Sequence, residues 1–155
     1  MALPPYSCGC ASQGYLVSRT VTPTDRCICT KAYRNLCSKG PNPCATSFQL
    51  DLTEYVENSI NDTETFELVK YNTAGFSSVT VSSAGLLQVT TDGVGGEEYV
   101  IEYKVSTVED GVTYSVNGYV YLCLKDLCRG VTCAEGEECD NCTGSCVNIV
   151  ADLEL

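Results

Sequence analysis

Hydrophobic and polar residues alternate along the middle of this chain. Between Ser47 and Leu124, apolar side chains recur at every second position, as in the run that holds Tyr99, Ile101 and Tyr103. A period of two places apolar residues on one face of a β-strand and polar residues on the other. The pattern predicts strands at about residues 48–52, 66–68, 79–81, 87–89, 99–105 and 112–124.

Turn-forming residues separate these runs. Glycine, asparagine, aspartate and serine gather at about residues 72–75, 83–85, 92–96 and 109–111. Short strands with glycine turns between them predict an all-β sandwich or barrel. No convincing amphipathic helix competes, and residues 52–60 favour one helical turn at most. Within the last run, Asn117-Gly118 is interpreted either as a hairpin turn between two shorter strands or as a bulge in one long strand.

The cysteines lie in two groups on either side of this region. Six precede residue 45, six follow residue 122, and the stretch between has none. The distribution predicts three parts: a basic cysteine-rich N-terminal arm at 1–45, a β-sandwich at 46–124, and an acidic cysteine-rich knot with a tail at 125–155. Disulfides persist in oxidising surroundings. We expect them at Cys8, Cys10, Cys27, Cys29, Cys37, Cys44, Cys123, Cys128, Cys133, Cys139, Cys142 and Cys146.

Cysteine spacing bears on how these residues are used. In each of the pairs Cys8/Cys10 and Cys27/Cys29 the two side chains point to the same side of an extended chain, so they are expected to reach separate partners. The alternative is a tetrathiolate zinc site made by the same four residues. We favour disulfides and assign no metal, because zinc ligands are usually separated by two to four residues and these are separated by one.

Charge is unevenly spread along the chain. The net charge is −11, yet residues 1–45 carry five bases and one acid, whereas the remainder is strongly acidic. The acidic bulk is expected to repel nucleic acid and anionic membranes. The basic segment is expected to dock on an acidic partner, including a neighbouring copy, unless its charges are simply solvated. The candidate docking residues are Arg19, Arg26, Lys31, Arg34 and Lys39.

Catalytic chemistry is not expected from this composition. The chain has no histidine, which removes Ser-His-Asp and Cys-His catalysis and histidine-ligated zinc. Its paired acids read as exposed turn residues, and no calcium loop pattern occurs, so we expect no cofactor. Among the tyrosines, Tyr99, Tyr103 and Tyr114 share core parity. Tyr119 and Tyr121 fall on the opposite face and are candidates for a contact surface.

Two stretches resemble known families. The pattern Gly85-Leu-Leu-Gln-Val-Thr, the strand at 99–105 and Gly118-Tyr-Val-Tyr-Leu resemble bacterial and phage immunoglobulin-like or cadherin-like repeats. That resemblance implies an immunoglobulin-like β-sandwich used as a spacer, adhesive stalk or virion decoration. Residues 128–147 are similar to follistatin-type or EGF-like cysteine knots, apart from the additional Cys142. We expect Cys142 to pair with Cys123 or with the N-terminal cluster.

The number of strands decides where the two cysteine groups lie. An odd number of up-and-down strands places Cys44 and Cys123 at opposite poles of the sandwich, and an even number brings them together. We favour opposite poles, with the two cysteine modules capping a rod. The tail at 147–155 alternates weakly and is predicted to add an edge strand to a partner.

Together these patterns predict a non-enzymatic structural protein. The first ten residues lack the basic start and apolar run of a secretory signal, despite disulfide-grade cysteine usage. We therefore expect a virus particle, most readily that of a bacteriophage, with this chain as a capsid decoration, fibre-anchoring or tail-associated component. Its partners are then other structural proteins of the assembly. The alternatives are a secreted cell-surface adhesion or ligand-binding module, and a zinc–thiolate interaction protein of the cytosol.

Overall fold

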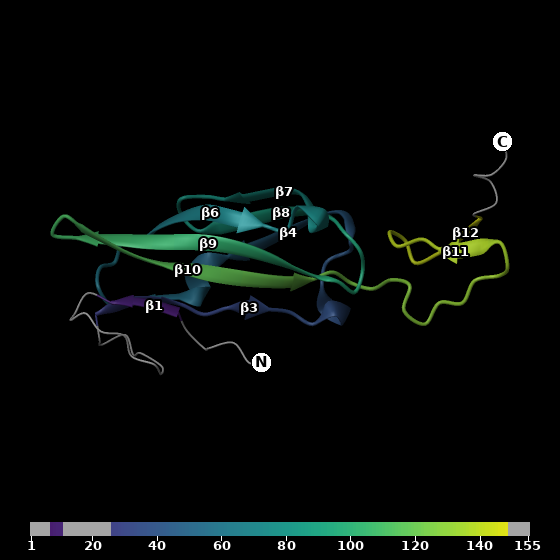
Figure 1. The fold of residues 1–155 in the computed structure, drawn as a ribbon, viewed down its shortest axis with the longest axis horizontal. Helices are drawn as coiled ribbons and strands as arrows, with labels where there is room; N and C mark the ends of the chain where they lie inside the picture. Colours follow the sequence, from purple (N-terminus) through teal and green to yellow (C-terminus); the bar gives the residue numbers. More distant parts are fainter. Residues whose placement is uncertain (1–6, 11–25, 149–155) are drawn as a thin grey trace.

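Two β-sheets face each other in the computed structural model, which describes residues 7–10 and 26–148 (Figure 1). The four-stranded sheet has the order β3-β10-β9-β6 and the three-stranded sheet the order β4-β8-β7. Their bounds are β3 Tyr33–Arg34, β4 Cys44–Asp51, β6 Thr65–Tyr71, β7 Phe76–Val81, β8 Leu86–Asp92, β9 Glu98–Glu109 and β10 Val112–Cys123. The predicted all-β, disulfide-rich sandwich is confirmed. Helical structure in the described residues is limited to the 3₁₀ turns η2 Cys37–Lys39, η3 Leu52–Tyr55 and η4 Thr73–Gly75.

The core fills the space between the two sheets. It is built from the alternating residues of the central strands, with Ile101 and Val105 of β9 and Leu87 of β8 completely buried. Burying a side chain of this size contributes about 1.5–3 kcal/mol relative to leaving it exposed. Aromatic rings extend the core along its length, since Phe66 lies 6.1 Å from Tyr103 and Phe76 lies 5.7 Å from Tyr99 between ring centroids. The alternation therefore identified the inward face correctly.

Strands β9 and β10 form the longest hairpin of the fold. Asp110 and Gly111 connect them, with φ angles of 53° and 79°. Two consecutive left-handed residues make the hairpin turn whose twist matches that of its strands. The predicted turn at 109–111 is confirmed.

Asn117-Gly118 neither turns nor bulges, so both interpretations of that pair are wrong. Strand β10 runs unbroken, and every residue from Val112 to Cys123 pairs in a single register with β9. Gly118 lies directly opposite Tyr103, and a Cβ at Gly118 would be 2.7 Å from Cε1 of that ring. The glycine is needed for space beneath an aromatic ring rather than for a change of direction.

Part of the N-terminal segment is built into the sandwich. Strands β1 (Ser7–Cys10), β2 (Cys27–Thr30) and β5 (Val56–Asn58) form a third sheet. All four residues of β2 are buried, and its Ile28 belongs to the main core. Strand β3 then pairs in parallel with β10. Residues 26–44 therefore pack as part of the body, although the sequence suggested a separate arm.

The cysteines of β1 and β2 face each other across the pair. The register sets Cys8 opposite Cys29 and Cys10 opposite Cys27, and each of these pairs is a disulfide. The two members of each Cys-x-Cys motif thus reach separate partners, as their spacing suggested. In this state the four sulfurs have no thiolate to offer zinc, which weighs against the metal alternative.

The C-terminal knot projects beyond one end of the sandwich (Figure 1). It contains the short strands β11 (Glu137–Cys139) and β12 (Cys146–Asn148), and two disulfides close it, Cys128–Cys139 and Cys133–Cys146. The tail at 149–155, where an edge strand was predicted, lies outside the described residues. Among the described residues no helix is long and apolar enough to span a membrane.

Cys44 and Cys123 lie at this same end of the sandwich, so the prediction of opposite poles is wrong. Disulfides Cys37–Cys123 and Cys44–Cys142 join the N-terminal group to the C-terminal one. The sandwich between these bonds uses β4 and β6 to β10, an even number of strands, so the chain leaves it near where it entered. Cys142 has reached the N-terminal group, one of the two partners expected for it.

Candidate interaction surface

The outer face of the four-stranded sheet carries the tyrosines that the sequence placed away from the core. Tyr119 and Tyr121 lie on β10 on either side of Val120, which is buried. Alternation therefore turns both rings outward, where they are half-buried. Their centroids are 6.3 Å apart and their planes differ by 24°. The two rings form an aromatic pair on the surface of the sheet.

Arg34 is placed beside this pair by the short strand β3. The parallel register sets Arg34 next to Tyr121, and the guanidinium carbon lies 4.7 Å from the centre of the ring. Its Nε is 3.1 Å from Oε2 of Glu98 on β9. A cation over an exposed ring contributes about 0.5–1 kcal/mol, and an exposed ion pair contributes no more than that. The side chain is oriented by both contacts while 54% of its surface remains open to a partner.

Glu102 lies opposite Tyr119 on the neighbouring strand β9 and binds its hydroxyl. Only 9% of this residue is exposed, and its carboxylate accepts hydrogen bonds from Nδ2 of Asn117 at 2.5 Å and from the hydroxyl of Tyr119 at 3.3 Å. Nζ of Lys70, on β6, lies 3.8 Å from the other carboxylate oxygen. These partners matter because a buried charge without them is strongly unfavourable. The network therefore joins Tyr119 on β10 to the neighbouring strand β9 and, through Lys70, to β6.

Burial raises the pKa of the Tyr119 hydroxyl above its ordinary value, and the nearby Glu102 carboxylate raises it further. The hydroxyl therefore stays protonated at neutral pH and keeps donating to Glu102. The surface then presents two aromatic faces, a fixed guanidinium and the exposed ammonium of Lys70. This set of groups is suited to contact with a protein surface.

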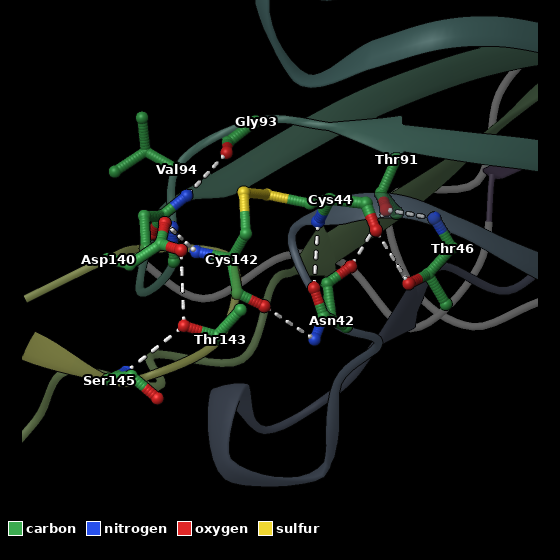
Figure 2. Close-up of a disulfide and its surroundings, with 12 residues drawn as sticks. Asn42, Cys44, Thr46, Thr91, Gly93, Val94, Asp140, Cys142, Thr143 and Ser145 are labelled. Atoms are coloured by element: carbon green, nitrogen blue, oxygen red, sulfur yellow. Dashed lines mark hydrogen bonds between the residues drawn. A yellow bond between two sulfur atoms is a disulfide. The ribbon is translucent and has the colours of Figure 1, made fainter. Parts of the chain in front are cut away.

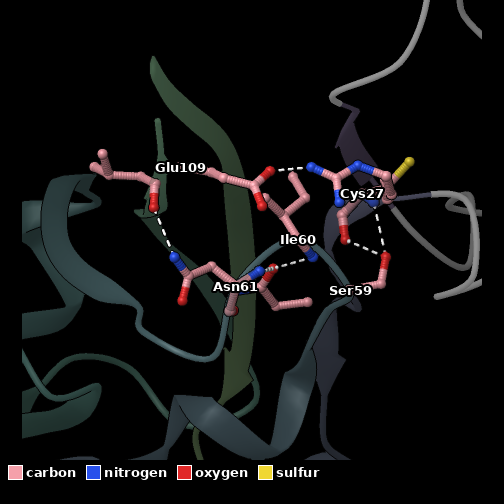
Figure 3. Close-up of polar contacts among 8 residues, drawn as sticks. Cys27, Ser59, Ile60, Asn61 and Glu109 are labelled. Atoms are coloured by element: carbon pink, nitrogen blue, oxygen red, sulfur yellow. Dashed lines mark hydrogen bonds and ion pairs between the residues drawn. The ribbon is translucent and has the colours of Figure 1, made fainter. Parts of the chain in front are cut away.

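The remaining predicted docking residues are not gathered at this surface. Arg26 forms an ion pair with Glu109 at the far end of β9, about eleven residues or roughly 35 Å along the strand from Glu98 (Figure 3). Lys31 and Lys39 are exposed, and Lys39 lies in η2 at the knot end. Arg19 lies outside the described residues. In the described part of the basic segment the charges thus do not form one patch, and Arg26 and Arg34 bind acids of the same chain.

The ends of the sandwich are held by asparagine side chains as well as by disulfides. At the knot end, Nδ2 of Asn42 donates to the carbonyl of Cys142 at 3.2 Å, next to the bond between Cys142 and Cys44 (Figure 2). Nearby, Asn141 donates to the carbonyl of Gly93 and accepts from the amide of Gly95. These contacts fix the knot to the loop between β8 and β9.

At the opposite end, Nδ2 of Asn61 donates to the carbonyl of Val108 at 2.8 Å, and Ser59 accepts from the amide of Cys27 (Figure 3). Asn61 and Asn141 both begin N-glycosylation-type triplets in the sequence. Both side-chain amide nitrogens donate to backbone carbonyls of the same chain.

Sequence reasoning missed Glu98, Glu102, Asn117 and Lys70 at the surface. For Glu98, Glu102 and Asn117 a signal was available in the β9–β10 hairpin, whereas Lys70 is placed by the pairing of β6 with β9. A two-residue turn at Asp110-Gly111 fixes the register, and that register sets Glu102 opposite Tyr119. Within the described residues, no group of three or more acidic or cysteine side chains is arranged to hold a metal ion.

Comparison with known proteins adds no family to this description. The chain matches no protein-family model, no curated protein and no solved structure. Its function is therefore argued from the disulfides and the outer face of the sheet.

Proposed function

We propose that this chain is a non-enzymatic structural protein on the outside of a virus particle, in the setting of a bacteriophage capsid decoration, fibre anchor or tail-associated component. It holds a structural neighbour through the outer face of its four-stranded sheet, with Arg34, Tyr119 and Tyr121 as anchors. Strand β3, which carries Arg34, belongs to the basic N-terminal segment, so part of that segment contributes to the docking face.

The observation that carries the proposal is the use of every cysteine in a disulfide. All twelve are paired in six bonds, and none is free. Such bonds persist in oxidising surroundings and add stability to a body of this size, about 2–4 kcal/mol each when well placed. A part that must survive outside a cell gains from this cross-linking, whereas a cytosolic protein would have its thiols kept reduced.

The composition of the outer face supports a protein partner. Tyrosine and arginine are the side chains most often found as anchors in protein interfaces. Here both are oriented before binding, Arg34 by Glu98 and Tyr119 by Glu102. A pre-oriented anchor loses less conformational entropy when it binds.

Two measurements test the proposal. Particles of the virus or organism that encodes the chain are purified and analysed by mass spectrometry and immunogold labelling. The proposal expects the chain on the outside of the particle. Its recovery from a cell-surface or culture-medium fraction alone would contradict the proposal and favour a secreted adhesion module.

The second measurement tests the docking face. The double variant Tyr119→Ala/Tyr121→Ala is compared with wild type for binding to particles that lack the chain. Loss of two anchors, each contributing about 2 kcal/mol, is expected to weaken binding by about a thousandfold if the two losses add. Thr113→Ala, an exposed position on the same strand, is the matched control and is expected to bind normally. Equal binding by the double variant and the control would contradict this docking face.

A further inference from the structure

The two disulfides that join the cysteine groups bracket the sandwich at one end. Cys37 binds Cys123 and Cys44 binds Cys142, with sequence separations of 86 and 98 residues. Almost the whole sandwich lies in the loop that these bonds close. We infer that the protein is a tension-bearing connector in which a force applied between its two ends bypasses the sandwich. The use of this property on a particle rests on the proposed function, but the covalent route does not.

The shortest covalent route between the ends can be followed bond by bond. A pull that enters at β1 crosses from Cys8 to Cys29 and follows the backbone to Cys44. It then crosses to Cys142 and continues to Cys146 in the knot. Residues 45–122 are not on this route. The bond Cys8–Cys29 likewise leaves residues 11–25 out of it.

A second covalent route also avoids the sandwich. From Cys29 the chain also reaches Cys37, crosses to Cys123, runs to Cys133 and crosses to Cys146. This route avoids Cys44 and Cys142 altogether and is nearly as short. Loss of either bracket bond therefore leaves the other to carry the load. Only the loss of both brings the sandwich into the load path.

The described ends of the chain are placed for a pull along the molecule. Strand β1 lies beside β10 on the flank of the sandwich, and β12 ends in the knot beyond its far end (Figure 1). Hydrogen bonds reinforce both bracket bonds. Asn35 accepts from the amide of Cys123 at 2.7 Å and donates to its carbonyl at 2.9 Å, and Asn42 binds the carbonyl of Cys142.

The bypass changes the extension that a pull can produce. The oxidised route holds about 19 backbone residues and two disulfides, which span about 80 Å when fully extended. If both bracket bonds are removed, the route from Cys29 to Cys133 includes the sandwich and holds about 104 residues, or about 370 Å. The difference is about 300 Å. Removal of one bracket bond leaves the span at about 80 Å.

Single-molecule pulling on the full chain, with handles at its two termini, tests the inference. Wild type, Cys37→Ser/Cys123→Ser and Cys44→Ser/Cys142→Ser are expected to show no unfolding step near 300 Å. The fourfold variant that carries both pairs of substitutions is expected to show it. A step near 300 Å in oxidised wild type, or in either single-pair variant, would overturn the inference.

A second measurement covers the case in which the fourfold variant does not fold. Oxidised wild type is held at constant force while a thiol reductant is added. The inference expects the large extension only after both bracket bonds have been cleaved, and a large extension on the first cleavage event would contradict it. Neither pulling measurement requires a partner. A chain that is absent from particles but shows the bypass would contradict the proposed function alone.

Discussion

Gly118→Ala is expected to destabilise the protein, although glycine is usually a poor residue for the middle of a strand. Gly118 lies within β10, opposite Tyr103 of β9. The described residues with positive φ do not include it, so alanine is compatible with the backbone at this position. If conformation alone mattered, the substitution would stabilise the fold by about 0.4–1 kcal/mol through the unfolded chain.

The lack of space around Gly118 reverses the sign of the expected change in stability. A Cβ there would lie within contact distance of Cζ of Tyr103, 2.5 Å from its hydroxyl oxygen and 2.7 Å from Cε1. The ring has little freedom to move, because Tyr103 is only 1% exposed and its centroid lies 6.1 Å from that of Phe66. Forcing an additional methyl group into a packed core costs about 1–3 kcal/mol. We expect a net loss of about 1–2 kcal/mol, since the backbone effect offsets part of this cost.

Urea unfolding without reductant measures this loss. With a slope of about 1–3 kcal/mol/M, a loss of this size lowers the midpoint by about 0.3–2 M. Gly111→Asn at the tip of the hairpin is the matched control. A Cβ at Gly111 meets nothing within 4 Å, and asparagine tolerates its φ of 79°. An unchanged or raised midpoint for Gly118→Ala would show that Gly118 is not needed to make room for Tyr103.

Three further predictions concern Tyr103 and Asn141. Tyr103→Phe is expected to raise the free energy of unfolding by up to about 1 kcal/mol, because the Tyr103 hydroxyl is buried without a hydrogen-bond partner among the described residues. Urea unfolding measures this change, and a decrease of more than about 1 kcal/mol in the free energy of unfolding would contradict it. Burial raises the pKa of Tyr103 above its ordinary value of 10.0, so the hydroxyl ionises more readily in the unfolded chain. The contribution of the protonated Tyr103 hydroxyl to the free energy of unfolding is complete below pH 10 and is lost as pH rises through the folded-state pKa. Between pH 8 and 11, the free energy of unfolding should therefore decline less in Tyr103→Phe than in wild type. Parallel declines would contradict this assignment to Tyr103. Asn141→Ala removes two hydrogen bonds to the loop between β8 and β9, so amide exchange at Gly95 is expected to rise tenfold or more, and unchanged exchange would show that the disulfide alone holds the knot.

The strands of the sandwich were predictable because one face of each is buried. A shift of a single residue would expose Ile101 and Val105 to water, so only one orientation of the strand buries its apolar residues. The hairpin tip was predictable for a similar local reason, since Asp110-Gly111 suits the left-handed turn that joins β9 to β10. Such signals need only neighbouring residues.

The role of Gly118 does not follow from its neighbours in the sequence. Next to an asparagine, a glycine suggests a turn, and only its partner across the hairpin explains it. That partner followed from the turn at Asp110-Gly111, which pairs Gly118 with Tyr103 and Tyr119 with Glu102. The strand pairing therefore carried the information about both the core contact and the interaction surface.

Disulfide connectivity was beyond the sequence. Six cysteines allow fifteen pairings within one group, and bonds between groups add many more. Cys44 and Cys142 meet because β4 enters the sandwich at the end where the knot is attached, a consequence of how the strands are ordered in two sheets. Strand order depends on contacts distant in sequence, which alternation does not encode.

A disulfide map of the unreduced protein shows whether the two cysteine groups are joined to each other. After free thiols are blocked at acidic pH, trypsin separates Cys37 in residues 35–39, Cys44 in residues 40–70 and Cys123 in residues 105–125. We predict that residues 35–39 are linked to 105–125, and that residues 40–70 are linked to the fragment 130–155 that contains Cys142. A link between 35–39 and 40–70 would contradict it, because the two cysteine groups would then be closed separately and the sandwich would lie in the path between the ends of the chain.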